Sequence, residues 1–172
     1  MRDSDVTVRD GSIVDLVRTS ALLHRCLVAS PEIYPESIAD AYSQYLSPAA
    51  LRGYLDCGGH LLVAEEQLEL AGFACGVPDS ANKHFGTYYG AWVSVVPAMR
   101  ERGIGSLLLR KIEGRAFATG CHKFYVMVQT KNEPAFRFFQ RAGYLTEGVL
   151  RRHWSGADFY FMSHFLEQPD AT

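Results

Sequence analysis

The sequence has no apolar run that approaches the roughly 18 to 20 residues needed to cross a bilayer as a helix. Its N-terminal stretch, MRDSDVTVRD, is charged and lacks the apolar segment of a secretory signal peptide. These absences predict a cytoplasmic protein without a membrane partner. Lysine and arginine number 17 and aspartate and glutamate 19, a net charge of -2. Without a net positive charge, we expect no binding to nucleic acid.

Metal-binding and redox motifs are missing as well. No two of the four cysteines have Cys-x-x-Cys spacing, which excludes the usual zinc and dithiol motifs. We therefore expect free and mostly buried thiols at Cys26, Cys57, Cys75 and Cys121. The six histidines are scattered without a His-x-x-x-His pair, so the sequence predicts no metal site.

Apolar and aromatic residues are plentiful, at 48% and 12% of the 172 residues. That is enough to build a core without disulfides. No repeat, linker or low-complexity run divides the chain. We expect a single domain over residues 1–172, with an ordered core from about residue 5 to residue 166.

The pattern of apolar residues predicts a mixed sheet with helices. Strands are predicted at residues 5–9, 60–66, 68–77, 87–96, 122–129, 144–152 and 158–166. Helices are predicted at residues 12–29, 47–58, 103–119 and 132–143, and a loop with a short helix at 31–46. Hairpins in the first half favour antiparallel pairing, whereas the strand–helix–strand unit over residues 87–129 must be parallel and right-handed. The fold class is therefore α/β or α+β.

Residues 93–106, VSVVPAMRERGIGS, carry the clearest chemical signal, because a strand leads through a turn rich in arginine and glycine into a helix. The N-terminus of a helix has backbone N–H groups without partners and a partial positive charge, which together bind phosphate. Gly103 and Gly105 let the main chain approach a diphosphate closely.

Known phosphate-binding patterns fit this turn unequally. A dinucleotide fingerprint requires a third glycine where the chain has Leu108, and an acidic residue where the next strand ends at Gln129. The P-loop pattern is absent. Arg100 to Gly105 instead resembles Gln/Arg-x-x-Gly-x-Gly/Ala, the pyrophosphate signature of the GNAT superfamily of N-acetyltransferases. A helix start with incidental glycines remains an alternative.

A second segment strengthens the resemblance. Asn132 to Tyr144, NEPAFRFFQRAGY, resembles the superfamily element Asn-x-x-Ala-x-x-Phe/Leu-Tyr/Phe-x-Lys/Arg-x-Gly-Phe/Tyr and lies one helix and one strand after the first motif. The run LLVAEEQLELAGFACG looks like the family's hairpin, and EGVLRRHWSGADFYFMSHFL looks like the closing strands of peptide N-terminal acetyltransferases. The resemblance covers residues 5–166 and implies a central sheet of about six or seven strands with about four helices and splayed parallel strands at the cofactor site.

The resemblance implies that acetyl-CoA is the cosubstrate and that no metal is needed. Main-chain groups of residues 93–95 would hold the acetyl group and the pantetheine arm, and amides of residues 101–106 would hold the pyrophosphate. Asn132 would contact the pantetheine arm, or simply cap its helix, and Phe139 would lie beside the thioester. The cofactor-binding residues implied are Val93, Ser94, Val95, Arg100, Glu101, Arg102, Gly103, Ile104, Gly105, Ser106, Asn132 and Phe139.

The catalytic positions depart from the family pattern. Phe139 stands where a tyrosine often protonates the leaving thiolate, and Met127 stands where peptide N-terminal acetyltransferases have a glutamate. Tyr89 occupies the position of the glutamate of histone acetyltransferases and is the catalytic candidate, because it can still donate a proton. Weaker candidates, each with an ordinary structural interpretation, are Tyr88, His84, Glu65, Glu66 and Tyr125.

The expected reaction is direct attack by a primary amine, on a small molecule or at a peptide N-terminus, on the acetyl thioester in a ternary complex. Two segments would shape the acceptor cleft. The charged or aromatic residues that they carry are Glu32, Glu36 and Asp40 in residues 31–46, and Arg151, Arg152, His153 and Trp154 in residues 151–158. A catalytically weak CoA-binding or regulatory module is the alternative, and a longer acyl-CoA is also open. Family members often dimerise, which leaves a homodimer open, although the sequence specifies no interface.

Overall fold

The computed structural model describes residues 6–79 and 86–166. Within these residues the strands are β1 (Thr7–Asp10), β2 (His60–Glu66), β3 (Glu69–Pro78), β4 (Thr87–Val95), β5 (Lys123–Gln129), β6 (Leu145–Trp154) and β7 (Ala157–Phe165). The α-helices are α1 (Leu16–Val28), α2 (Glu36–Tyr45), α3 (Pro48–Asp56), α4 (Ile104–Ala118) and α5 (Glu133–Arg141). None of the helices described is long and apolar enough to cross a membrane.

All the strands belong to one mixed sheet with the order β1-β2-β3-β4-β5-β7-β6. Only β4 and β5 are parallel, and every other neighbouring pair is antiparallel. Helix α4 connects the two parallel strands, as the strand–helix–strand pattern predicted. The α/β mixed-sheet fold class is thereby confirmed.

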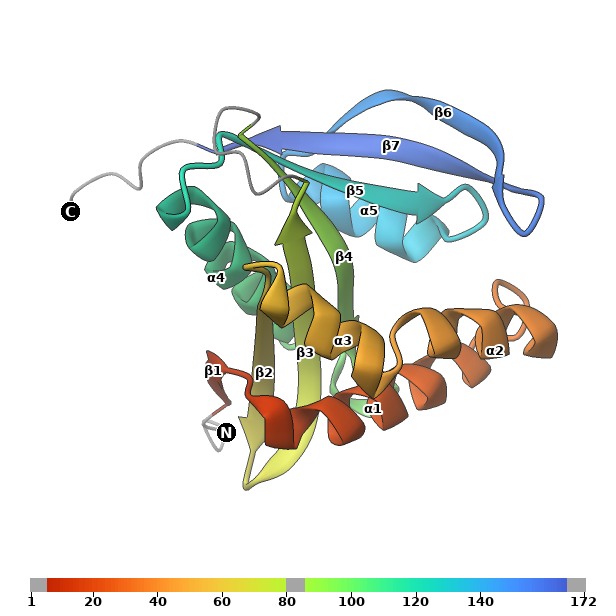
Figure 1. The fold of residues 1–172 in the computed structure, drawn as a ribbon. Helices are drawn as coiled ribbons and strands as arrows, with labels where there is room; N and C mark the ends of the chain where they lie inside the picture. The colour runs from red at the N-terminus through yellow and green to blue at the C-terminus, as the bar shows by residue number, and fades with distance from the viewer. Residues whose placement is uncertain (1–5, 80–85, 167–172) are drawn as a thin grey trace.

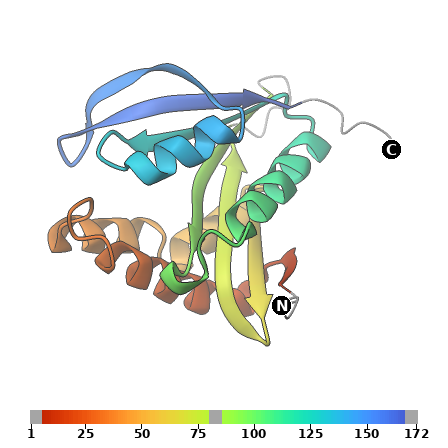
Figure 2. The ribbon, with the colours of Figure 1, turned by 180° about the vertical axis from the view of Figure 1, so that it is seen from behind.

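Helices cover both faces of the sheet. Helices α1, α2 and α3 lie on one face, seen in front in Figure 1, and α4 and α5 lie on the other, seen in front in Figure 2. Each face has its own buried apolar cluster. Helix α4 buries Ile104, Leu108, Ile112 and Ala116, a spacing that puts these residues on one side of a helix.

The segment predicted as a loop with a short helix contains a full helix, α2. Ala39 and Tyr42 are buried on this helix and Leu46 is buried just beyond it. These residues pack in the same apolar cluster as α1 and the sheet. Tertiary burial therefore stabilises a helix whose local sequence is only weakly apolar.

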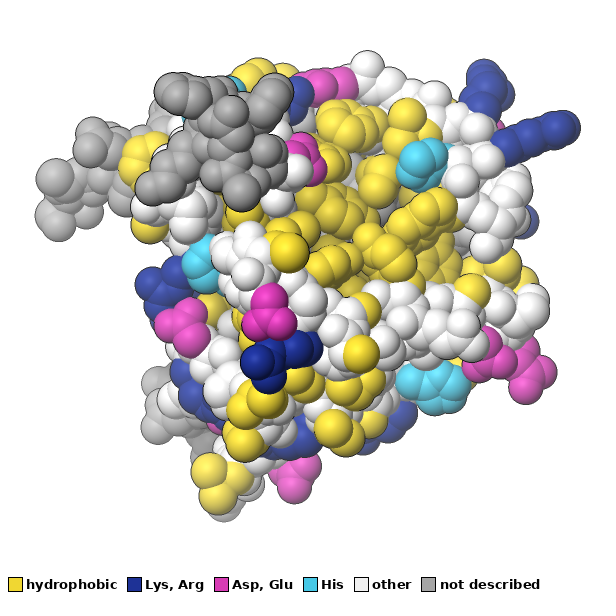
Figure 3. Space-filling view, in the orientation of Figure 1, with side chains coloured by type: hydrophobic (Ala, Val, Ile, Leu, Met, Phe, Trp, Pro, Cys, Tyr) yellow, Lys and Arg dark blue, Asp and Glu magenta, His cyan; other side chains and the backbone are white. Residues whose placement is uncertain are grey.

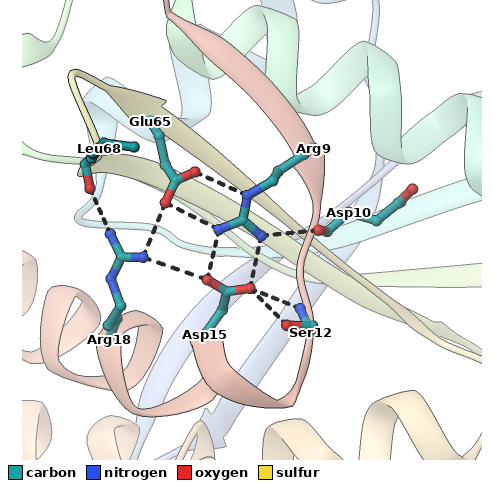
Figure 4. A network of polar contacts seen from close by, with 7 residues as sticks. All are labelled: Arg9, Asp10, Ser12, Asp15, Arg18, Glu65 and Leu68. Carbon is teal, nitrogen blue, oxygen red and sulfur yellow. Dashed lines mark hydrogen bonds and ion pairs between the residues drawn. The ribbon is translucent and has the colours of Figure 1, made fainter.

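An ion-pair network joins β1, α1 and β2 near the N-terminal end of the described chain (Figure 4). Arg9 donates to both carboxylate oxygens of Asp15, at 2.8 and 2.9 Å, and to Glu65 at 2.9 Å. Arg18 donates to Glu65 at 3.0 Å. The Asp15 side chain is fully buried, and the Arg9 guanidinium, as the main cause, lowers its pKa from 3.8 to about 2.

The parallel strands β4 and β5 separate along their length. They pair only at Thr87–Lys123, Tyr88–Phe124 and Tyr89–Tyr125. From there β4 continues to Val95 and β5 to Gln129, each paired only with its other neighbour among the described residues. The predicted divergence at the C-terminal ends of these strands is confirmed, and it opens the sheet where α4 begins (Figure 1).

Candidate functional site

A cavity of about 950 Å³ lies where β4 and β5 diverge. Its walls come from both faces of the sheet, since residues of α4 and α5 line it on one side and residues of α1, α2 and the α1–α2 connection on the other. Hydrophobic side chains gather in a hollow between α2 and the β5–β7 part of the sheet (Figure 3). The cavity thus joins a glycine-rich turn to an apolar recess.

The turn that precedes α4 forms one end of this cavity. Glu101 and Gly103 have positive φ, at 63° and 79°, and Gly103 is the N-cap of α4. The first intrahelical bond runs from the Leu107 N–H to the Gly103 carbonyl, at 3.0 Å. The N–H groups of Ile104, Gly105 and Ser106 therefore precede the helical ladder and carry the partial positive charge of a helix start. Because these residues line the cavity, this end suits an anion.

The two arginines of the turn have different surroundings. Arg100 lines the cavity and its Nε donates to the carbonyl of Val95 at 3.1 Å, which fixes the turn to the end of β4. Arg102 instead forms an ion pair with Glu66 on β2 and does not line the cavity. The predicted role of Arg102 in cofactor binding stays a prediction, and its side chain is directed to Glu66 in this structure.

The other predicted cofactor residues come together around the cavity. Those that line it are Val93, Ser94, Val95, Arg100, Glu101, Gly103, Ile104, Gly105, Ser106, Asn132 and Phe139. Asn132 caps α5, since its side-chain oxygen accepts from the Ala135 N–H at 3.2 Å. Its side-chain nitrogen donates to the Tyr34 hydroxyl at 2.8 Å, so the amide also links the two walls of the cavity. Burial raises the pKa of Tyr34, which keeps the phenol protonated.

At two positions where the family often has an acid–base residue, this chain has a side chain with no proton to transfer. Phe139 is 7% exposed, lines the cavity, and packs against Phe138 and Tyr144 with ring centroids 5.0 and 5.1 Å apart. Met127 lines the cavity from β5. Neither side chain can act as a general acid or base.

Tyr89 lies where the pairing of β4 and β5 ends. It lines the cavity and stacks on Tyr125, with ring centroids 5.3 Å apart. Burial, followed by the neighbouring phenols of Tyr45 and Tyr54, raises the pKa of Tyr89 above its usual value of 10. The phenol therefore stays protonated at neutral pH and cannot act as a base.

The weaker candidates have structural partners. Tyr88 is fully buried and donates to the Gly76 carbonyl at 2.8 Å, and Tyr125 donates to Asp79 at 2.6 Å. The two glutamates of β2 form the ion pairs already described, with Arg9, Arg18 and Arg102. Of these candidates none lines the cavity, and His84 falls outside the described residues.

The acceptor segments contribute fewer charges than the sequence suggested. Glu32, His153 and Trp154 line the cavity, whereas Glu36, Asp40, Arg151 and Arg152 do not. The structure adds cavity residues that the sequence did not single out for this role, and these are Tyr34, Tyr42, Trp92, Gln129 and Phe159. A period of two along β5 is the signal that could have found Gln129, because it places this side chain on the same face as Met127. In the part of the chain that is described, no three His, Cys, Asp or Glu side chains gather as metal ligands.

The chain is similar to a known protein family and to several solved structures. A model of the Acetyltransferase (GNAT) family matches residues 22–144. A GNAT-family protein from Desulfovibrio desulfuricans is similar in structure, with 27% identity, a TM-score of 0.74, and coverage of 94% of this chain and 99% of that chain. PaiA N-acetyltransferase from Thermoplasma acidophilum, in complex with coenzyme A, has 17% identity, a TM-score of 0.78, and coverage of 94% and 99%. Ribosomal-protein-alanine N-acetyltransferase from Brucella melitensis has 21% identity, a TM-score of 0.72, and coverage of 93% and 99%.

Proposed function

This chain belongs to the GNAT acetyltransferase family, and from that premise we propose that it transfers the acetyl group of acetyl-CoA to a primary amine, on a small molecule or at a peptide N-terminus. The observation that supports this most directly is the meeting of the Gly103 turn with the unpaired edges of β4 and β5 in one cavity. An elongated ligand with an anionic end fits such a place.

The residues present suit acetyl-CoA. The free N–H groups of Ile104, Gly105 and Ser106 would hold the pyrophosphate, and the open edge of β4 at residues 93–95 would pair with the amide groups of the pantetheine arm. Asn132 would contact that arm while it caps α5. An acetyl thioester supplies an activated carbonyl carbon, to which the amine nitrogen bonds as the carbon–sulfur bond breaks.

The protein contributes mainly positioning and polarisation. Backbone N–H groups on the open edge of β4 near Val95 would stabilise negative charge on the carbonyl oxygen. Holding the amine beside the thioester removes much of the entropic barrier. Tyr89 is the proposed proton donor to the leaving sulfur, because it lines the cavity as a protonated phenol while Phe139 has no proton to give. The proton that the amine nitrogen loses as the amide forms would then return Tyr89 to the phenol.

Two measurements test this function. Isothermal calorimetry with acetyl-CoA should show binding, and ligand should raise the melting temperature by mass action. Release of free thiol should then depend on an added amine. Absence of binding at millimolar acetyl-CoA by folded protein would exclude the function. Binding without thiol release for any amine would favour the alternative function, a CoA-binding module. The observation behind this alternative is that Met127 and Phe139, at two family acid–base positions, cannot transfer a proton.

We place the reaction in the cytoplasm. Cys26, Cys57, Cys75 and Cys121 are all free thiols, and Cys57 is exposed. Free thiols persist in a reducing compartment. Detection of the native protein in a subcellular fraction other than the cytoplasmic one would contradict this location.

A further inference from the structure

Beside Tyr89 and His153, five aromatic side chains wall the part of the cavity that faces α1 and α2. This aromatic chamber consists of Tyr34, Tyr42, Trp92, Trp154 and Phe159, and all five line the cavity. Tyr42 is at its centre, with ring centroids 5.7 Å from Tyr34, 5.4 Å from Trp92 and 5.6 Å from Trp154. Trp154 also meets Phe159 edge-on at 6.1 Å. The rings come from the α1–α2 connection, α2, β4, β6 and β7, so several elements combine to form one apolar surface.

Charged side chains are scarce on this side of the cavity. Those that line its other parts are Arg100, Glu101, Arg110, Glu113 and Arg141, all on the turn before α4 or on α4 and α5. On the chamber side, the cavity is lined by the exposed carboxylate of Glu32 and by the exposed imidazole of His153, which stacks on Trp154. A polyamine or an aminoglycoside would therefore meet few ionic partners there, whereas an apolar body would bury against rings.

Gln129 adds one polar group to the chamber. It forms a register pair with Phe159, so the two side chains point to the same face of the sheet. Gln129 is 8% exposed and lines the cavity, and its buried Oε1 has no hydrogen-bond partner among the described residues. A buried carboxamide oxygen without a partner is rare in folded proteins, and this oxygen is itself closed off from the cavity although its residue lines it. A half-turn of the carboxamide exchanges its oxygen and nitrogen, so the oxygen can be presented to the cavity.

We propose that the acceptor is a small primary amine on an aromatic or apolar body, with the body held in the aromatic chamber and an amine N–H donated to Gln129. The proposal rests on the proposed acetyl transfer and specifies its acceptor. One N–H of the neutral amine bonds to Gln129, and the nitrogen lone pair stays free to attack the thioester. An apolar chamber also disfavours the charged ammonium form of the amine. The neutral nucleophile therefore forms there without a carboxylate base.

The first test compares amines with the wild-type enzyme at saturating acetyl-CoA. The aromatic probes are 2-phenylethylamine and tryptamine, and the polar probes are spermidine, kanamycin and a Ser-Gly-Gly-Gly peptide. We expect kcat/KM for thiol release to be at least tenfold higher with the aromatic amines. Faster turnover of any polar probe would overturn the proposal and leave acetyl transfer standing, whereas failure to bind acetyl-CoA would overturn the proposed function itself.

The second test needs no turnover. The chain has two tryptophans, Trp92 and Trp154, and both belong to the chamber. Titration with 2-phenylethylamine in the presence of CoA should therefore change intrinsic fluorescence saturably, and spermidine should not. Trp154→Phe should reduce the amplitude, because it removes one of the two fluorophores in the chamber. A saturable response to spermidine with none to 2-phenylethylamine contradicts the proposal.

Variants separate the chamber from the cofactor site. Gln129→Leu should raise KM for 2-phenylethylamine about tenfold, as expected for loss of a hydrogen bond in a ligand complex, and leave KM for acetyl-CoA within twofold. Its melting temperature should not fall, because leucine leaves no unpaired oxygen. Gln44→Leu, on the exposed side of α2, and Phe165→Ala, exposed on β7, are controls expected to behave as wild type. A rise in KM for acetyl-CoA alone would assign Gln129 to the cofactor and refute its role for the amine.

Discussion

At the scale of single residues, the site differs from its family mainly in proton transfer. Phe139 keeps the shape of the aromatic residue that the family motif allows there, packed between Phe138 and Tyr144, but it has no hydroxyl. A thiol is a tolerable leaving group, with a pKa of roughly 8.5 for a comparable cysteine. Protonation of the sulfur therefore helps the reaction without being essential to it.

Restoring the hydroxyl at position 139 should accelerate the enzyme. General acid catalysis is typically worth about 10²- to 10⁴-fold, and Tyr89 is proposed to supply part of it, so Phe139→Tyr should raise kcat by about tenfold at most. Steady-state thiol release at saturating substrates measures this. Phe139→Leu, which loosens the cavity wall, is the control and should lower kcat and acetyl-CoA affinity. A Phe139→Tyr enzyme slower than Phe139→Leu would show that position 139 is not near the sulfur.

Removing the hydroxyl of Tyr89 should have the opposite effect. Tyr89→Phe should lower kcat by about 10- to 100-fold with KM for acetyl-CoA unchanged. Because the pKa of Tyr89 is raised above its usual value of 10, the wild-type rate should increase with pH along the titration of the amine and show no falling limb below pH 10. Tyr125→Phe, outside the cavity, is the matched control. Full activity of Tyr89→Phe would place the proton donor elsewhere.

Asp15 makes fold stability sensitive to acid. Its pKa is lowered to about 2, so the folded form keeps the carboxylate ionised after an unfolded Asp15 would have bound a proton. The stabilisation is complete above about pH 4 and is lost as pH falls through 2. Asp15→Asn should cost about 1 to 3 kcal/mol at pH 7, because the hydrogen bonds to charged Arg9 are weakened. Urea unfolding at pH 7, 3.5 and 2.5 should show this gap shrinking; a constant gap would mean that the ion pair does not control stability.

At the scale of elements, the start of α4 is the proposed site of the cofactor's pyrophosphate. Gly105 lies in its first turn, and an added Cβ would lie 3.4 Å from Phe138 and 3.7 Å from Val95, which is ordinary contact distance. The protein itself therefore tolerates a small side chain there. What a larger or acidic side chain would disturb is the phosphate site in front of the helix.

Gly105→Glu should abolish binding of acetyl-CoA, because a carboxylate enters the site proposed for the pyrophosphate and repels it. Gly105→Ala should fold with unchanged or slightly raised stability, since alanine exceeds glycine in helix propensity by roughly 0.5 to 1 kcal/mol. Calorimetric titration of both variants, with circular dichroism to confirm folding, distinguishes charge from shape. Tight binding by folded Gly105→Glu would contradict the proposed phosphate site.

At the scale of the whole molecule, the sheet is closed at one end of the β4–β5 junction and open at the other. The ladder ends at Tyr89 and Tyr125, although β4 remains paired with β3 apart from one bulge and β5 remains paired with β7 throughout. The gap connects the apolar clusters of the two faces, so a ligand in it can meet the α4 turn and the aromatic chamber at once. A mixed sheet with its one parallel junction splayed provides this arrangement.

Hydrogen exchange should report occupancy of that gap. Backbone amides of residues 90–95 that face β5 lack strand partners, so acetyl-CoA should slow exchange of this peptide by about tenfold or more if it pairs with the open edge. The hairpin of β2 and β3, which is paired along its length apart from one bulge, should not change. Protection confined to the hairpin, with none at residues 90–95, would contradict the proposed place of the pantetheine arm.

Much of the fold follows from local sequence. Apolar periodicity placed every described strand, and the chain order of strands and helices required one parallel crossover. The turn before α4 could also be predicted, because Arg100, Gly103 and Gly105 are close together in the chain and the chemistry of a helix start is local. The length of helix α2 was underestimated, because its stability depends on packing against α1 and the sheet.

What the sequence by itself determined is the family, the mixed sheet and a helix start able to bind an anion, because each depends on residues close together in the chain. Only the tertiary structure decided which side chains from distant parts of the chain come into contact. Arg102 forms an ion pair with Glu66, 36 positions away, and does not line the cavity. Tyr34, Trp92 and Trp154 join one aromatic chamber beside the carboxamide of Gln129. Such contacts depend on how the two faces of the sheet are packed and on where its strands part, and no local pattern in the chain encodes either.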